Sequence, residues 1–212
     1  MTNCVFCDPE KMKADTLKSY QHFFEKVGFA LVTPGQSMLI STSHLQCFGE
    51  LSEELDEEYL GAKKSLRERV SREFSEPFLM EMGVWGQSVN HAHTHFIPLK
   101  GEGYSLNSAM EEMVLSGPDK VRYTRVKNLG ELKEIYRSEG KYVSIEEHDQ
   151  LYVCHVEGIT FDPKNLSPNL TYGGFFSQKI GLSGTGNWKD MTQADKTNDE
   201  IKRNMTKNKL TA

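Results

Sequence analysis

Three histidines alternate with other residues in the short segment His91-Ala92-His93-Thr94-His95. Side chains at positions i, i+2 and i+4 of a β-strand project from one face, so a strand here would bring the three imidazoles together. Near neutral pH an imidazole can act as a nucleophile, a proton donor or a metal ligand. The spacing predicts a reactive site on one strand. The alternatives are a strand with solvated histidines and an adventitious metal patch.

Two strands and a tight turn are predicted ahead of this segment. Residues 25–32 and 37–41 have the composition of strands. Between them, Pro34 presets φ at the second position of a type II turn, and Gly35 supplies the positive φ of the third position. The pattern therefore predicts a β-hairpin.

A long amphipathic helix is predicted to follow the hairpin. Ser52 suits the N-cap position, and the acidic residues Glu53 and Glu54 fall in the first turn. The apolar residues at helical spacing are Leu55, Tyr59, Ala62, Leu66 and Val70. Two further strands are predicted over residues 78–84 and 89–98, and the second of them carries the histidines.

The second half of the chain alternates between strand and helix patterns. A strand is predicted over residues 121–126, a helix over 129–138, and a strand pair over 142–145 and 151–156. The large apolar residues of this half include Tyr152, Phe175, Phe176, Ile180 and Trp188. Exposed aromatic residues in this number would favour aggregation, so most are expected to pack on the rest of the chain or on each other. Residues 192–212 are predicted to form a polar tail that can fray or move.

Length and composition narrow the class of protein. At 212 residues, the chain fits one domain, or one domain with a sizeable extension. The net charge of −5 does not favour binding to duplex nucleic acid by charge alone, although nucleic acid stays open as a partner. No apolar run approaches the ~20 residues of a membrane span, and the N-terminus lacks the regions of a secretory signal.

These features predict a cytoplasmic protein without a membrane partner. In that compartment the four cysteines should be reduced or bound to metal and not joined in disulfides. Cys47 and Cys154 have no partner pattern and are expected to be small buried apolar residues. Cys4 and Cys7 form a Cys-x-x-Cys pair, for which a metal site, a redox pair and a loose N-terminus are competing interpretations.

The residues around the three histidines resemble a known signature. Gly86-Gln87-Ser88 precede the histidines, and the intervening positions are apolar apart from Thr94. This pattern resembles the signature of the histidine triad (HIT) superfamily of nucleotide hydrolases and transferases. The predicted hairpin, with His44 after it, and the start of the long helix resemble the same superfamily. The resemblance covers residues from about 4 to 105.

The resemblance implies roles for four residues. It places the nucleophile on the middle histidine, His93, which would attack the α-phosphorus of a nucleotide conjugate. His95 would donate to the α-phosphate, and Ser88 and Gln87 would contact the phosphate oxygens and the leaving group. Strand geometry alone does not identify which histidine attacks.

The resemblance also implies a metal site. In some branches of the superfamily, zinc is held by a Cys-x-x-Cys pair, a distant histidine and the first histidine of the triad. The matching residues in this chain are Cys4, Cys7, His44 and His91. Two cysteines and two histidines form a closed tetrahedral set, which fits structural zinc better than catalytic zinc.

The combined prediction is an α+β fold with a HIT-like antiparallel sheet, packed helices and a C-terminal α/β extension. Residues 1–115 are expected to be the nucleotide-binding catalytic core, residues 116–191 an extension packed on it, and residues 192–212 the tail. The predicted function is hydrolysis or transfer at the α-phosphate of a small-molecule nucleotide conjugate, through a covalent nucleotidyl-histidine intermediate. The alternatives are a nucleotide- or RNA-associated adaptor with little or no turnover, and a zinc-binding interaction module. A homodimer is an open expectation.

Overall fold

The computed structural model describes residues 4–31, 33–98, 122–156 and 192–211. The predicted apolar residues Phe175, Phe176, Ile180 and Trp188 lie outside these ranges, whereas Tyr152 lies within them and is buried. No helix in the described part of the chain is long and apolar enough to cross a membrane.

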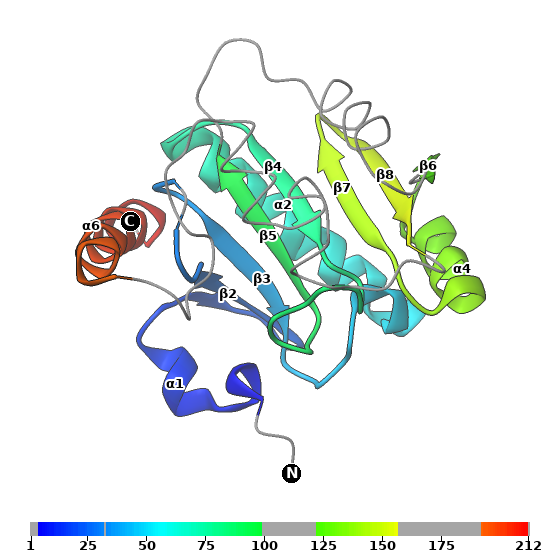
Figure 1. The fold of residues 1–212 in the computed structure, drawn as a ribbon, viewed down its shortest axis with the longest axis horizontal. Helices are drawn as coiled ribbons and strands as arrows, with labels where there is room; N and C mark the ends of the chain where they lie inside the picture. Colours follow the sequence, from blue (N-terminus) through cyan, green and yellow to red (C-terminus); the bar gives the residue numbers. More distant parts are fainter. Residues whose placement is uncertain (1–3, 32, 99–121, 157–191, 212) are drawn as a thin grey trace.

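One eight-stranded sheet organises the described residues (Figure 1). Its strands, in chain order, are β1 (Thr16–Ser19), β2 (Phe23–Val27), β3 (Ser37–Ser41), β4 (Pro77–Glu81), β5 (His93–Pro98), β6 (Arg122–Val126), β7 (Val143–Glu147) and β8 (Gln150–His155). The helices are α1 (Pro9–Lys13), α2 (Asp56–Glu73), α4 (Leu129–Glu139) and α6 (Gln193–Leu210), with short 3₁₀ turns η1 (Val5–Cys7), η2 (Phe48–Glu50) and η3 (Glu53–Leu55).

The spatial order of the strands is β1-β2-β3-β5-β4-β7-β8-β6, and every paired ladder is antiparallel. The predicted α+β class with an antiparallel sheet is therefore confirmed. β4 pairs with β5 on one side and with β7 on the other. The C-terminal strands thus extend the sheet formed by the N-terminal strands, and they occupy a strand edge that could otherwise pair with another chain.

The predicted hairpin and long helix are present. β3 has the predicted bounds, and residues 33–36 form a turn in which Gly35 has a φ of 90° and the Gln36 amide donates to the Thr33 carbonyl. α2 buries Tyr59, Ala62, Leu66 and Val70. Its start differs from the prediction, because the 3₁₀ turn η3 follows Ser52 and the Ser52 side chain makes no capping hydrogen bond.

A single large hydrophobic cluster lies between the sheet and helices α2 and α4. It includes Leu66 of α2, Phe96 of β5, Leu132 of α4 and Val153 of β8, all of them buried. The core therefore runs without a break from the N-terminal strands into the C-terminal ones. Cys47 and Cys154 are fully buried, as predicted.

The last helix, α6, packs beside β2 and the C-terminal end of α2 (Figure 1). Leu210 joins the main hydrophobic cluster, and Thr206 is fully buried. At its N-terminus, Thr192 and Asp195 form a capping box. The tail is polar, as predicted, and it was expected to fray or move. In the structure most of it forms a helix whose Thr206 and Leu210 are buried against the rest of the chain.

Two local predictions about the N-terminal half were wrong. The histidine strand was predicted to begin at residue 89, but β5 begins at His93. His91 and Ala92 precede it because the Ala92 amide donates to the carbonyl of Leu45, which lies outside the sheet. The first strand of the hairpin was predicted over residues 25–32, but β2 spans Phe23–Val27.

Candidate functional site: a thiol–imidazole cluster beside two histidines

Two cysteines and two histidines meet at one end of the sheet. Their ligand atoms all lie within 4.8 Å of one another, and we call Cys4, Cys7, His44 and His91 the thiol–imidazole cluster. The cysteines come from η1 and the residue before it. His44 follows β3, and His91 precedes β5. The four residues that the sequence predicted as metal ligands are therefore brought together by three separate segments.

The spacing within the thiol–imidazole cluster fits a tetrahedral metal ion. Cys7 Sγ lies 3.2 Å from His44 Nδ1 and 3.5 Å from His91 Nδ1, and Cys4 Sγ lies 3.4 Å from His91 Nδ1. The bond lengths of zinc to sulfur and nitrogen imply separations of about 3.3–3.8 Å between tetrahedral ligand atoms. The donor set is the combination of thiolates and imidazoles that zinc prefers.

The remote nitrogen of His91 is fixed by the end of β3. His91 Nε2 lies 2.7 Å from the carbonyl oxygen of Ser41 and 3.1 Å from the Ser41 hydroxyl. A carbonyl can only accept, so Nε2 carries the proton and the lone pair of Nδ1 faces the thiols. Burial lowers the pKa of His91, which favours the neutral form that a metal ligand requires.

His93 is held in the other tautomer. Its Nδ1 lies 2.6 Å from the backbone carbonyl oxygen of His91, so Nδ1 carries the proton and Nε2 has the free lone pair. Burial lowers the pKa of His93 to about 4, and the side chain is therefore neutral at pH 7. A neutral imidazole with one accessible lone pair is the form that can attack an electrophile.

His95 projects from the same face of β5 as His93. The two ring centroids are 4.9 Å apart at an interplanar angle of 73°. Burial, together with the neighbouring His93, lowers the pKa of His95 well below its ordinary value. A neutral imidazole keeps one N–H that can act as a donor. On the other face of the strand, Thr94 contacts the Tyr59 hydroxyl of α2 at 3.3 Å.

The other two predicted site residues lie on the loop between β4 and β5. Gln87 donates from its side-chain amide to the Gln46 carbonyl at 2.9 Å, and Ser88 is exposed. No hydrogen bond joins Ser88 to His93 within the described residues. The structure therefore brings His93 and His95 together and places Ser88 in solvent.

One aromatic residue links the thiol–imidazole cluster to the histidines. Phe6 lies between Cys4 and Cys7 in the chain and is buried. Its ring centroid is 5.2 Å from that of His93 and 5.6 Å from that of His91, both in edge contacts. The sequence analysis missed Phe6, although its place inside the Cys-x-x-Cys pair could have indicated a position beside the metal ligands.

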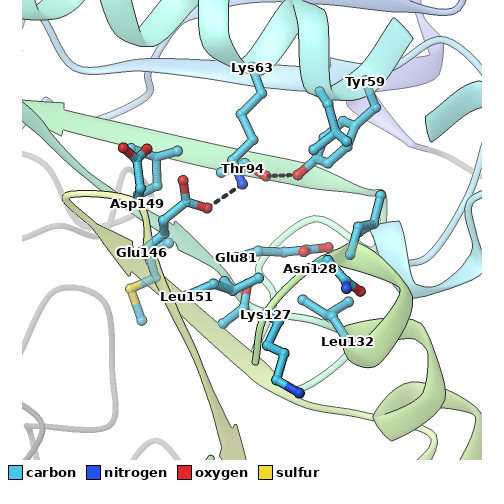
Figure 2. Close-up of a pocket in the computed structure, with 15 residues that line it drawn as sticks. Tyr59, Lys63, Glu81, Thr94, Lys127, Asn128, Leu132, Glu146, Asp149 and Leu151 are labelled. Atoms are coloured by element: carbon cyan, nitrogen blue, oxygen red, sulfur yellow. Dashed lines mark hydrogen bonds and ion pairs between the residues drawn. The ribbon is translucent and has the colours of Figure 1, made fainter. Parts of the chain in front are cut away.

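A separate cavity lies on the α2 side of the sheet (Figure 2). Its volume is about 170 Å³. Figure 2 shows Lys63 joined to Glu146 and Tyr59 joined to Thr94 across this cavity. Because Thr94 points toward it and the neighbouring His93 and His95 take the opposite face, the cavity is distinct from the histidine site.

Comparisons with known proteins give a consistent result for about half of the chain. No family profile matches the chain. The relative named Protein hit, from Bacillus subtilis (strain 168), is 29% identical over 107 residues, which are 48% of this chain and 74% of the relative. The chain resembles histidine triad proteins.

Solved structures of histidine triad proteins also match part of the chain. A HIT family member from Bacillus subtilis is 23% identical, with 54% of this chain and 94% of that chain covered and a TM-score of 0.42. A Zn-bound histidine triad family protein from Mycobacterium smegmatis is 19% identical, with 49% and 81% covered and a TM-score of 0.36. These similarities agree with the resemblance noted in the sequence.

Proposed function

We propose that this chain is a histidine triad protein that hydrolyses or transfers the nucleotidyl group of a small-molecule nucleotide conjugate. The observation that carries the proposal is the state of His93, which is neutral, held through Nδ1 and free at Nε2. The proposal treats residues 1–115 as the catalytic half and residues 116–191 as an extension packed on it.

The proposed reaction has two steps. First, Nε2 of His93 attacks the α-phosphorus, a P–N bond forms, and the P–O or P–N bond to the leaving group breaks. The leaving group takes the bonding electron pair and a proton from solvent, and the proton that the attacking water loses in the second step returns to solvent. Second, water or another acceptor attacks the same phosphorus, the P–N bond to His93 breaks, and the lone pair returns to Nε2. His95 donates a hydrogen bond to an α-phosphate oxygen in both steps.

We also propose that the thiol–imidazole cluster holds one structural zinc ion. The ion would be bound by Cys4, Cys7, His44 and His91. It would cross-link the N-terminal segment to the segment after β3 and the segment before β5. His91 then has two tasks, because its side chain faces the cluster while its backbone carbonyl accepts from His93. Zinc takes no part in the chemical steps of this proposal.

A substrate panel tests the proposed function. The panel contains adenosine and guanosine phosphoramidates, dinucleoside polyphosphates and capped dinucleotides, with products identified by mass. We expect release of a nucleoside monophosphate from at least one conjugate, and an adduct of one nucleotidyl group on His93 when the reaction is quenched early. Nucleotide binding without turnover on the whole panel would contradict the enzyme and favour the adaptor with little or no turnover.

A further inference from the structure

The connection between β2 and β3, residues 28–36, is held by side chains from the far end of the sequence. Asp199 Oδ1 accepts from the Leu31 amide at 2.6 Å, and Lys202 Nζ donates to the Leu31 carbonyl at 2.9 Å. Both backbone polar groups of Leu31 are therefore bonded by one face of α6. A loop residue bonded in this way loses much of its local freedom.

The same loop carries Phe29, whose ring lies close to two cations. Lys26 Nζ is 4.2 Å from the ring centroid and Arg203 Cζ is 5.8 Å from it, both within the range of cation–π attraction. Asp15 pairs with both cations, at 3.1 Å and 3.2 Å. Arg203 of α6 thus contacts the ring of Phe29 as part of a partly buried ion-pair network.

Phe29 in turn contacts Phe6. The two rings are nearly parallel, at 7°, with centroids 5.9 Å apart. Phe6 makes the edge contacts to His91 and His93 described above. A continuous set of ring contacts therefore runs from Arg203 through Phe29 and Phe6 to His93.

We propose that α6 positions the reactive histidine. Arg203 and Phe29 are positioning residues, because the ring contacts that join them to His93 run through Phe6. A fixed Phe29 ring limits the motion of the Phe6 ring stacked on it. Phe6 in turn holds η1, and the cysteines at its two ends, against the ring of His93. The part of the proposal that concerns turnover rests on the proposed function, whereas the part that concerns η1 does not.

Three variants on α6 separate this effect from general stability. Arg203→Met removes the cation but keeps an aliphatic side chain, and Arg203→Lys restores a cation. Lys196→Met removes an exposed cation from the same helix and is the matched control. The measurements are made on the full-length protein purified with its zinc. They are the rate of zinc release to a chromophoric chelator, hydrogen exchange of residues 4–8 and 29–31, and kcat and KM on the active conjugate.

We expect Arg203→Met to speed both zinc release and hydrogen exchange by about 3- to 10-fold, the usual size of coupling between packed groups. kcat should fall by a similar factor with little change in KM, and Arg203→Lys should recover most of the loss. Lys196→Met should match the wild type. If Arg203→Met and Lys196→Met give equal zinc release and equal exchange, the proposal is wrong.

A second pair of variants keeps the proposal testable if Arg203→Met folds poorly. Phe29→Leu removes the stacked ring and Phe29→Tyr keeps it, so only the former should loosen η1. If the wild type turns over no conjugate but Phe29→Leu still accelerates exchange of residues 4–8, the proposed function fails and the positioning role stands. If Phe29→Leu and Phe29→Tyr behave alike, the positioning role fails whatever the activity.

Discussion

The N-terminal and C-terminal parts of the sheet are built alike but use their polar residues differently. A helix packs against each part, α2 against the N-terminal strands and α4 against the C-terminal ones, and both helices contribute to one hydrophobic cluster. In the N-terminal part, the buried polar groups next to β5 are imidazoles aimed at one another and at thiols. In the C-terminal part, several charged groups form ion pairs with the first half.

Several contacts show this second use. Lys133 of α4 is buried and pairs with Asp56 at the start of α2, and Glu146 of β7 pairs with Lys63 and Arg67 of α2. These pairs balance charges at the junction of the two parts. The same packing of helices on a sheet can therefore bring imidazoles and thiols together in one part and bury ion pairs in the other. Which of the two occurs depends on the side chains that face the junction.

The largest effect is expected from removing the proposed nucleophile of the N-terminal part. His93→Ala should reduce kcat by ~10⁴-fold or more, as expected when a covalent catalyst is lost. Nucleotide binding should stay within about tenfold, or ~1.4 kcal/mol, because the imidazole acts mainly in the chemical step. Single-turnover kinetics and a nucleotide titration measure the two effects. A kcat close to that of the wild type would remove His93 from the mechanism.

The next largest effect is expected from the thiol–imidazole cluster. Cys4→Ser combined with Cys7→Ser should abolish stoichiometric zinc and lower Tm, at about 2–4 °C for each kcal/mol lost in a chain of this size. Zinc affinity should also fall as the pH is lowered, because protons compete for the ligands. Cys154→Ala, which removes a buried thiol elsewhere, is the control and should keep its zinc. Full zinc in the double variant by metal analysis would rule out the site.

The sequence predicted those features that depend on neighbouring residues, and it did not predict those that depend on contacts between residues far apart in the chain. β3 and its turn were predicted within their bounds because Pro34 and Gly35 act on their own backbone. The four residues of the thiol–imidazole cluster were singled out because residues of the right type stood at family-like positions, and the structure brings them together. The packing of α6 could not be predicted from the sequence. Its hydrogen bond from the Leu31 amide to Asp199 joins residues 168 positions apart, and no periodic pattern indicates such a contact. Likewise, the true start of β5 depends on the distant carbonyl of Leu45.

A third prediction concerns the ion pair between Lys133 and Asp56, which joins the C-terminal part to α2. Lys133→Met should lower stability by ~1–3 kcal/mol, because Asp56 keeps its charge without a partner while remaining partly solvated. kcat should not change, since this pair lies at the α2–α4 junction and not at the histidines. Chemical denaturation and steady-state kinetics measure both quantities, with the exposed Lys127→Met as control. A loss of kcat at unchanged stability would mean that the junction serves the reaction directly.

The smallest expected effect concerns Glu81, which lines the cavity of Figure 2 and accepts from the Phe48 amide at 2.7 Å. Burial raises the pKa of Glu81 from 4.5 to about 7. Between these pH values the folded protein holds this proton and the unfolded chain releases it. The contribution of Glu81 to stability is therefore complete below pH 4.5 and is lost as the pH rises through 7.

Glu81→Gln removes this titration and keeps an oxygen that can accept from Phe48. The Tm of the variant relative to the wild type should therefore rise between about pH 4.5 and pH 7, by a few degrees, and stay level above pH 8. Glu57→Gln, which changes an exposed carboxyl on α2, should show no such trend. If the Tm difference between Glu81→Gln and the wild type is the same at every pH, burial does not raise the pKa of Glu81. The protein then tolerates the charged carboxylate at this position.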